Sequence, residues 1–115
     1  MGSFCITLSK IIRSATLSSS GGKLLANGAN SRMAELDGGG GGGAGGSVLL
    51  EVVSATNNIP IEVKGGDGAD NAASIGTPPA WCYAPGGGGG GGVVIHPPTL
   101  LNISINATGG AAGIV

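Results

Sequence analysis

The sequence is poor in aromatic residues and in charge. Only 3% of the 115 residues are aromatic and 10% are charged, while hydrophobic residues reach 41%, much of it alanine. Few large side chains are available, so we do not expect a conventional core centred on phenylalanine and leucine. Disordered chains usually combine high charge with low apolarity, so this composition does not favour disorder. Backbone hydrogen bonds between close-packed segments must therefore contribute more to stability than usual.

The charge of the sequence does not indicate a nucleic-acid-binding surface. The formal net charge is −1 and the isoelectric point lies near 5.6. A nucleic-acid partner calls for clustered basic residues. The five basic residues are instead scattered along the chain: Lys10, Arg13, Lys23, Arg32 and Lys64.

Long hydrophobic runs are also missing. The apolar stretch Phe4–Leu8 is too short for a signal peptide, and Lys10 and Arg13 interrupt the apolar residues after it. No segment has the length of a membrane span. If the protein is exported, we expect its signal to lie upstream and these 115 residues to be a fragment.

Groups for catalysis or metal binding are scarce, and we expect no enzyme and no cofactor. The two cysteines, Cys5 and Cys82, form one disulfide in an oxidising compartment or remain two thiols, and the sequence leaves both open. His96 is the only histidine. A Cys82/His96 nucleophile pair stays an alternative, although a loop thiol and a strand-end imidazole explain both residues. No paired-cysteine or H-E-x-x-H spacing for zinc occurs.

What the chain has in abundance is glycine, 26 residues in all, in two nearly unbroken runs at Gly38–Gly46 and Gly86–Gly92. A flexible linker is one interpretation. The other is an extended helix with three residues per turn, which lets glycine chains approach closely and bond to one another. Each run leads straight into an apolar strand-like segment, which favours ordered packing. A dinucleotide-binding loop would need a helix after the glycines, so we reject that motif.

Alternation of apolar and polar residues predicts short strands separated by turns. Residues 1–20 are interpreted as an N-terminal strand or a frayed end, and residues 21–115 as one glycine-rich β domain. Turns are predicted at Asn27–Gly28, at Asn57–Asn58 and over Gly65–Asn71. The strands predicted within the domain are Leu24–Ala26, Ser47–Ala55, Ile59–Lys64, Val93–Ile95 and Leu101–Asn106.

An internal repeat connects these elements. The segments Leu24–Asn30, Ile61–Asp70 and Ile103–Gly113 each read as a strand followed by small residues, with a glycine run between successive copies. The step from Gly28 to Gly68 is 40 residues and the step from Gly46 to Gly92 is 46, so we expect a period of forty-odd residues, with about two and a half units present. The predicted fold class is therefore mainly β, solenoid-like or β-helix-like, with packed polyglycine II-type segments and little or no helix.

The motifs GGGGGGAGGSVLLEV, IEVKGGDGADN, PGGGGGGGVV and ISINATGGAAG resemble glycine-rich repeats of large secreted surface proteins. Such repeats belong to adhesins and gliding-type proteins of Bacteroidota-type bacteria, and the resemblance covers roughly Gly22–Gly113. A looser similarity exists to polyglycine-helix layers of phage tail-tip adhesins and of glycine-rich receptor ectodomains. The resemblance implies an extracellular, non-enzymatic scaffold or adhesive module that contacts neighbouring repeats of a larger chain.

Local motifs indicate two candidate sites. The segment Gly65–Ala72 resembles one copy of a calcium-binding nonapeptide, so Asp67, Asp70 and Asn71 are the ligands to test, against the interpretation of a simple turn. Trp81 and Tyr83, in a proline-rich stretch, are candidates for glycan or protein contact, or else Trp81 supports the core. Asn102 and Asn106 fit the N-glycosylation pattern, although alternating polar residues of a strand also explain them.

The leading hypothesis is a structural and adhesive repeat module. The alternatives are a binding module that uses the Trp81–Tyr83 loop, and a protein that binds ice or another surface through a flat glycine layer.

Overall fold

Six strands form two parallel three-stranded sheets. The computed structural model describes residues 10–32, 38–70 and 85–114. The first sheet has the order β1-β3-β5 and the second the order β2-β4-β6. The expectation of mainly β structure is confirmed, since the described residues contain no α-helix. The strands are β1 (Lys10–Ser18), β2 (Leu24–Leu25), β3 (Ser47–Thr56), β4 (Ile59–Glu62), β5 (Val93–Ile95) and β6 (Ile103–Asn106).

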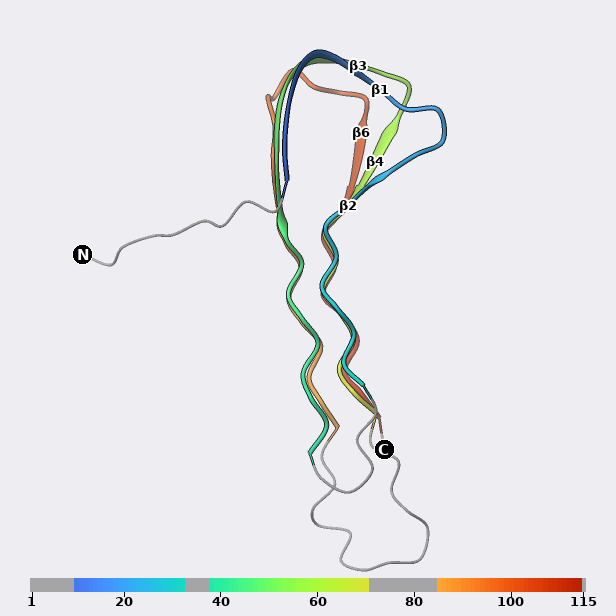
Figure 1. The fold of residues 1–115 in the computed structure, drawn as a ribbon, viewed down its shortest axis with the longest axis vertical. Coiled ribbons are helices and arrows are strands. Elements are labelled where there is room, and N and C mark those ends of the chain that lie inside the picture. Colours follow the sequence, from blue (N-terminus) through green and yellow to red (C-terminus); the bar gives the residue numbers. More distant parts are fainter. Residues whose placement is uncertain (1–9, 33–37, 71–84, 115) are drawn as a thin grey trace, which may run out of the picture.

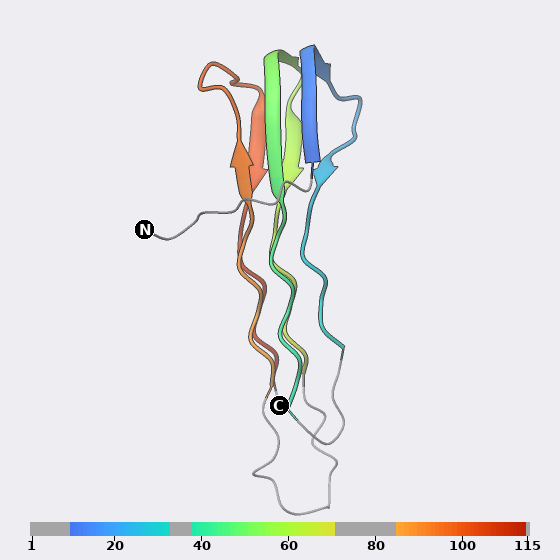
Figure 2. The ribbon, with the colours of Figure 1, turned by 60° about the vertical axis from the view of Figure 1, so that its left-hand side comes forward.

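The chain alternates between the two sheets. It runs up one column through β1, β3 and β5, turns at the top, and runs down the other column through β2, β4 and β6 (Figure 1). Successive passes therefore lie beside one another within each layer, as the rotated view shows (Figure 2). The predicted turn at Asn57–Asn58 is confirmed, and Asn57 adopts a left-handed conformation with φ of 62°.

The apolar core lies between the sheets at their wide upper end. Alternate side chains of β3 and β4 point inward, and the turn before β6 adds Leu100. This confirms the predicted inward alternation of Ile59, Ile61 and Val63. The fully buried side chains of the core are Val48, Leu50, Val52, Ile61 and Val63.

The register of the strands corrects the repeat length. Lys10 pairs with Val48 and Leu24 with Ile61, so the first repeat has an offset of 37 to 38 residues rather than 40. The second has an offset of 44 to 46, which agrees with the predicted step from Gly46 to Gly92. Aligning Gly28 with Gly68 misplaced the first repeat by three residues. The apolar strands fix the pairing, because a slip would expose their buried faces.

Below the core the chain continues as two bonded layers. The polar layer consists of residues 26–32, 63–70 and 107–114, which follow β2, β4 and β6. The glycine layer consists of residues 38–46 and 86–92, which precede β3 and β5. In every pair of neighbouring segments the hydrogen bonds recur every third residue, the period of a polyproline II-type helix. The bonded N–H and C=O pairs include Gly28–Lys64, Ser31–Asp67, Gly42–Gly87, Gly45–Gly90, Gly65–Thr108, Gly68–Ala111, Gly66–Gly43 and Ala69–Gly40. The glycine runs are therefore ordered, mutually bonded segments.

Close approach explains why these segments need glycine. A Cβ atom on Gly42 or Gly66 would overlap a carbonyl oxygen of the facing layer or of the neighbouring segment. At Gly87 and Gly90 a Cβ would meet nothing within 4 Å. The requirement for glycine thus follows the three-residue period and does not apply to the whole run.

Three predictions about local structure were wrong. Asn27–Gly28 and Gly65–Asp70 form no turn but belong to the straight polar layer, because bonds to neighbouring segments replace local turn bonds. Leu101 is 84% exposed and lies outside β6, whereas Leu100 is buried. The last strand is therefore shorter than predicted.

Candidate functional site

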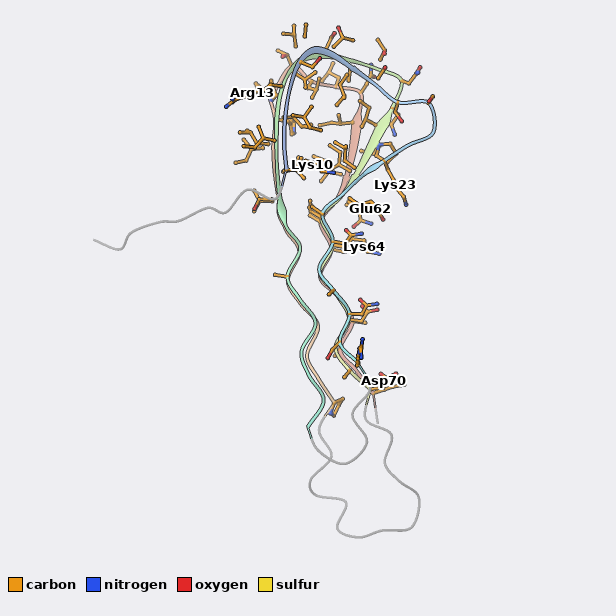
Figure 3. The ribbon with its side chains drawn as sticks, viewed as in Figure 1. Lys10, Arg13, Lys23, Glu62, Lys64 and Asp70 are labelled. Atoms are coloured by element: carbon orange, nitrogen blue, oxygen red, sulfur yellow. The ribbon has the colours of Figure 1, made fainter. Side chains whose placement is uncertain are left out.

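The two layers present different surfaces below the core. Side chains project outward from the polar layer, including those of Lys64 and Asp70, whereas the glycine layer is almost bare (Figure 3). Ala44 is the only residue in the described glycine layer with a side chain. The outward side of the polar layer, which we call the polar face, is the candidate site.

Asparagine and aspartate side chains on the polar face bind the backbone of the next segment. Asn30 Oδ1 accepts the N–H of Asp67 at 2.8 Å, and Asp67 Oδ1 in turn accepts the N–H of Ala111 at 2.8 Å. One period away, Asn27 Oδ1 accepts the N–H of Lys64 at 2.9 Å. Asp70 Oδ1 accepts the N–H of Ile114, also at 2.9 Å. We call this set of four bonds the Asx ladder.

The ladder completes the hydrogen bonding of residues 63–70, the central segment. Each of its N–H groups from Lys64 to Ala69 has a partner, and these partners follow the three-residue period. One set reaches the neighbouring polar segment, one reaches the glycine layer, and one reaches an asparagine side chain. Within the same stretch, Gly65, Gly66 and Ala69 are buried.

A shallow polar groove runs over the ladder. Its volume is about 580 Å³, and backbone groups, two side-chain amides, one carboxylate and one ammonium group line it. Among the described residues Lys64 makes no ion pair. The lining includes Asn27, Asn30, Lys64, Asp67, Thr108 and Ala111.

Ion pairs lie higher up, beside the strands. Arg13 and Glu51 pair across β1 and β3, where the strand register places them opposite one another. Lys23 Nζ lies 3.0 Å from Glu62 Oε2. These two ion pairs connect neighbouring passes and therefore have a structural role.

The calcium candidates have a structural role in this arrangement. Asp67 and Asp70 each use one carboxylate oxygen in the Asx ladder. Asn71 lies outside the described residues. Within residues 10–32, 38–70 and 85–114, no three histidine, cysteine, aspartate or glutamate side chains gather as a metal site would require. Calcium binding therefore stays a prediction without a coordination set.

The remaining candidates are not brought together. Trp81, Tyr83, Cys5 and Cys82 lie outside the described residues, so aromatic binding, the disulfide and the Cys82/His96 pair stay predictions. His96 is half-buried after β5, where its Nδ1 lies 2.8 Å from the carbonyl oxygen of the next residue, Pro97.

The two asparagines of the glycosylation pattern support the local backbone. Asn102 Nδ2 donates to the carbonyl oxygen of Ala55 at 2.9 Å, which ties the last turn to the preceding one. Asn106 Oδ1 accepts the N–H of Thr108 at 3.2 Å.

Sequence reasoning missed Asn27 and Asn30 as functional groups and assigned them to a turn. The signal was present, because Asn27/Asn30 and Asp67/Asp70 share a spacing of three residues. That spacing matches one turn of a polyproline II-type helix and places both side chains of each pair on one face.

No protein-family model, curated protein or solved structure matches the chain. No helix among the described residues has the length and apolarity needed to cross a bilayer. Function is therefore inferred from the geometry of the layers.

Proposed function

We propose that this chain is a non-enzymatic structural and adhesive module of a larger cell-surface or secreted protein. In this proposal each up-and-down pass is one turn of a solenoid-like array, and neighbouring turns are its partners. The polyglycine II-type layers extend the module below its small core and hold the polar face flat. The resemblance to glycine-rich surface repeats supports an extracellular location.

The observation that carries the proposal is the complete hydrogen bonding of the central segment. All six N–H groups from Lys64 to Ala69 donate to neighbouring segments. Ordering a residue costs about 1–2 kcal/mol of backbone entropy, and glycine loses the most freedom. A flexible linker is not expected to bond all of its N–H groups in a three-residue pattern. Such bonding is expected of a rigid segment that resists bending and extension.

The chemistry of the polar face also favours a structural role over a catalytic one. Its carboxylate and amide oxygens accept backbone N–H groups, which fixes them in place and occupies part of their bonding capacity. What the face offers to a surface is a regular array of polar groups, spaced about 9 Å apart along each segment. Such an array suits multivalent weak contact rather than a single buried ligand.

Single-molecule force spectroscopy tests the structural role. The 115-residue chain is held by its two ends, and we expect one cooperative rupture followed by extension of the released chain. The Gly66→Ala variant is the control, because its Cβ overlaps the carbonyl oxygen of Ala29 and should abolish the rupture. Smooth entropic extension of the wild-type chain, with no rupture, would refute the proposal.

A further inference from the structure

The last pass of the chain leaves a row of backbone donors at one edge of the layers. Gly65 and Gly68 of the central segment donate to the segment that follows, and Gly42 donates likewise within the glycine layer. The equivalent N–H groups one pass later have no partner among residues 10–32, 38–70 and 85–114. We call this row, together with β5 and β6, the donor edge; its N–H groups belong to Gly88, Gly91, Gly109 and Ala112.

The first pass leaves acceptors at the opposite edge. The carbonyls of Lys64 and Asp67 accept bonds from the segment before them. Their equivalents are the carbonyls of Asn27 and Asn30, which accept no bond from any described residue. We call these carbonyls, together with β1 and β2, the acceptor edge.

The two edges match in direction and spacing. All strands within each sheet are parallel, so β5 and β6 point the same way as β1 and β2 (Figure 2). Donors and acceptors both recur every third residue, about 9 Å apart. A copy shifted along the stacking direction, without rotation, brings the N–H groups of Gly109 and Ala112 in the polar layer opposite the carbonyls of Asn27 and Asn30.

Apolar surface is exposed at both edges. Val93 and Leu101 lie on the last pass, at 50% and 84% exposure, and Ile11 and Leu25 lie on the first, at 50% and 48%. A hollow of about 300 Å³ beside the first turn is partly lined by Leu17, Leu24 and Ile59. Within the chain, Ile11, Val93 and Leu25 pair in register with Leu49, Ser47 and Glu62 of the middle pass, and these three residues are half-buried between their neighbours. A further pass at either edge would bury this surface in the same way.

We propose that the donor edge of one copy of this chain pairs with the acceptor edge of a second copy. This inference rests on the proposed structural role and adds a partner to it. The contact is head-to-tail and does not close on itself, so it generates filaments rather than dimers. Both sheets and the polar layer become continuous across each junction, with strands about 4.8 Å apart.

The test compares assembly of the wild-type chain with that of Ala112→Pro. Proline removes the N–H of residue 112 and places its ring at the donor edge, while its fixed φ suits an extended helix. Because that N–H has no partner among the described residues, the isolated fold should keep its thermal stability. Ala112→Ser is the matched control, since it keeps the N–H.

We expect wild type and Ala112→Ser to sediment as concentration-dependent filaments with a fibre reflection near 4.8 Å. Ala112→Pro should raise the concentration needed for assembly roughly tenfold or more. A folded wild-type chain that stays monomeric, a finite dimer, or filaments indifferent to Ala112→Pro would overturn the inference and leave the structural role standing. Loss of amide protection in the central segment of wild type would refute both.

Discussion

At the scale of single residues, the glycines fall into two classes with opposite requirements. In the segment 86–92, Gly89 faces the other glycine segment closely, so that an added Cβ would overlap the carbonyl oxygen of Gly43. Its neighbour Gly90 has open space around the same position. Gly89 and Gly90 therefore differ in whether a side chain is tolerated. Because of the three-residue period, the Cβ position of Gly89 faces a backbone segment and that of Gly90 faces solvent.

Gly89→Ala and Gly90→Ala form a matched pair that tests this difference. We expect Gly89→Ala to lower the free energy of unfolding by about 1–3 kcal/mol or more, because the overlapping atom is backbone and cannot rotate away. Gly90→Ala should be neutral or stabilise by about 0.4–1 kcal/mol through the unfolded state. Chemical denaturation measures both, and equal effects of the two variants would contradict the assigned register.

The Asx ladder makes a second prediction at the residue scale. Asp67→Ala removes the acceptor of the Ala111 N–H, and we expect a loss of about 0.5–1.5 kcal/mol in unfolding free energy. Asp67→Asn keeps an oxygen at Oδ1 and should lose less. Thermal unfolding of both variants measures the two losses in stability. If Asp67→Asn lowers stability as much as Asp67→Ala does, Asp67 does not stabilise the fold through this hydrogen bond.

At the scale of elements, the strands and the glycine segments are stabilised by different means. The strands β3 and β4 bury alternate side chains in a small core, as the sequence pattern predicted. The segments beyond them bury only two side chains, those of Val63 and Ala69, and are held mainly by backbone bonds. The core at the upper end fixes the strand register, and the register in turn aligns donors with acceptors in the layers below.

Leu50→Ala tests this dependence of the layers on the core. Leu50 is 1% exposed, and we expect its truncation to cost about 2–5 kcal/mol. Val53→Ala in the same strand is the control and should have little effect, since Val53 is 78% exposed. Amide exchange should show the central segment losing protection in Leu50→Ala, whereas retained protection would mean that the layers fold independently of the core.

Most of the strands could be predicted from the sequence, and the wrong turn predictions have a physical explanation. Alternating apolar residues predicted the strands that contain Val48 and Ile61. The uninterrupted glycine runs favoured packed segments over flexible linkers. The turn assignments at Asn27–Gly28 and Gly65–Asp70 were wrong, because these residues also suit an extended helix bonded to neighbours. Local propensity does not reveal such neighbours, since the bonding partners lie in other passes, 23 residues away for Gly66 and Gly43 and 36 for Gly28 and Lys64.

The candidate site was predictable only in part. Asp67 and Asp70 were singled out, but as calcium ligands rather than as acceptors for backbone N–H groups. The groove over the ladder combines residues from three passes, Asn30, Asp67 and Ala111 among them. The relative placement of passes depends on the register, which differs between the two repeats, so motif alignment alone did not give it.

At the scale of the whole molecule, the number of bonded amides in a segment reports the number of its neighbours. The central segment, which has a polar segment on each side and the glycine layer behind it, bonds every N–H from Lys64 to Ala69. The segment 86–92, at an edge, bonds only those of Gly86, Gly89 and Gly92 within the described residues. A stack of bonded rods thus predicts a graded and periodic pattern that a flexible linker cannot produce.

Residue-resolved amide hydrogen exchange on dilute, monomeric protein tests this pattern most directly. Bonded layers predict slow exchange at every amide from Lys64 to Ala69, and at one amide in three along residues 86–92. The protected amides there are those of Gly86, Gly89 and Gly92, with fast exchange at Gly87 and Gly90. Uniformly fast exchange through both segments, or protection without the three-residue period, would contradict the ordered, mutually bonded layers on which the proposed function depends.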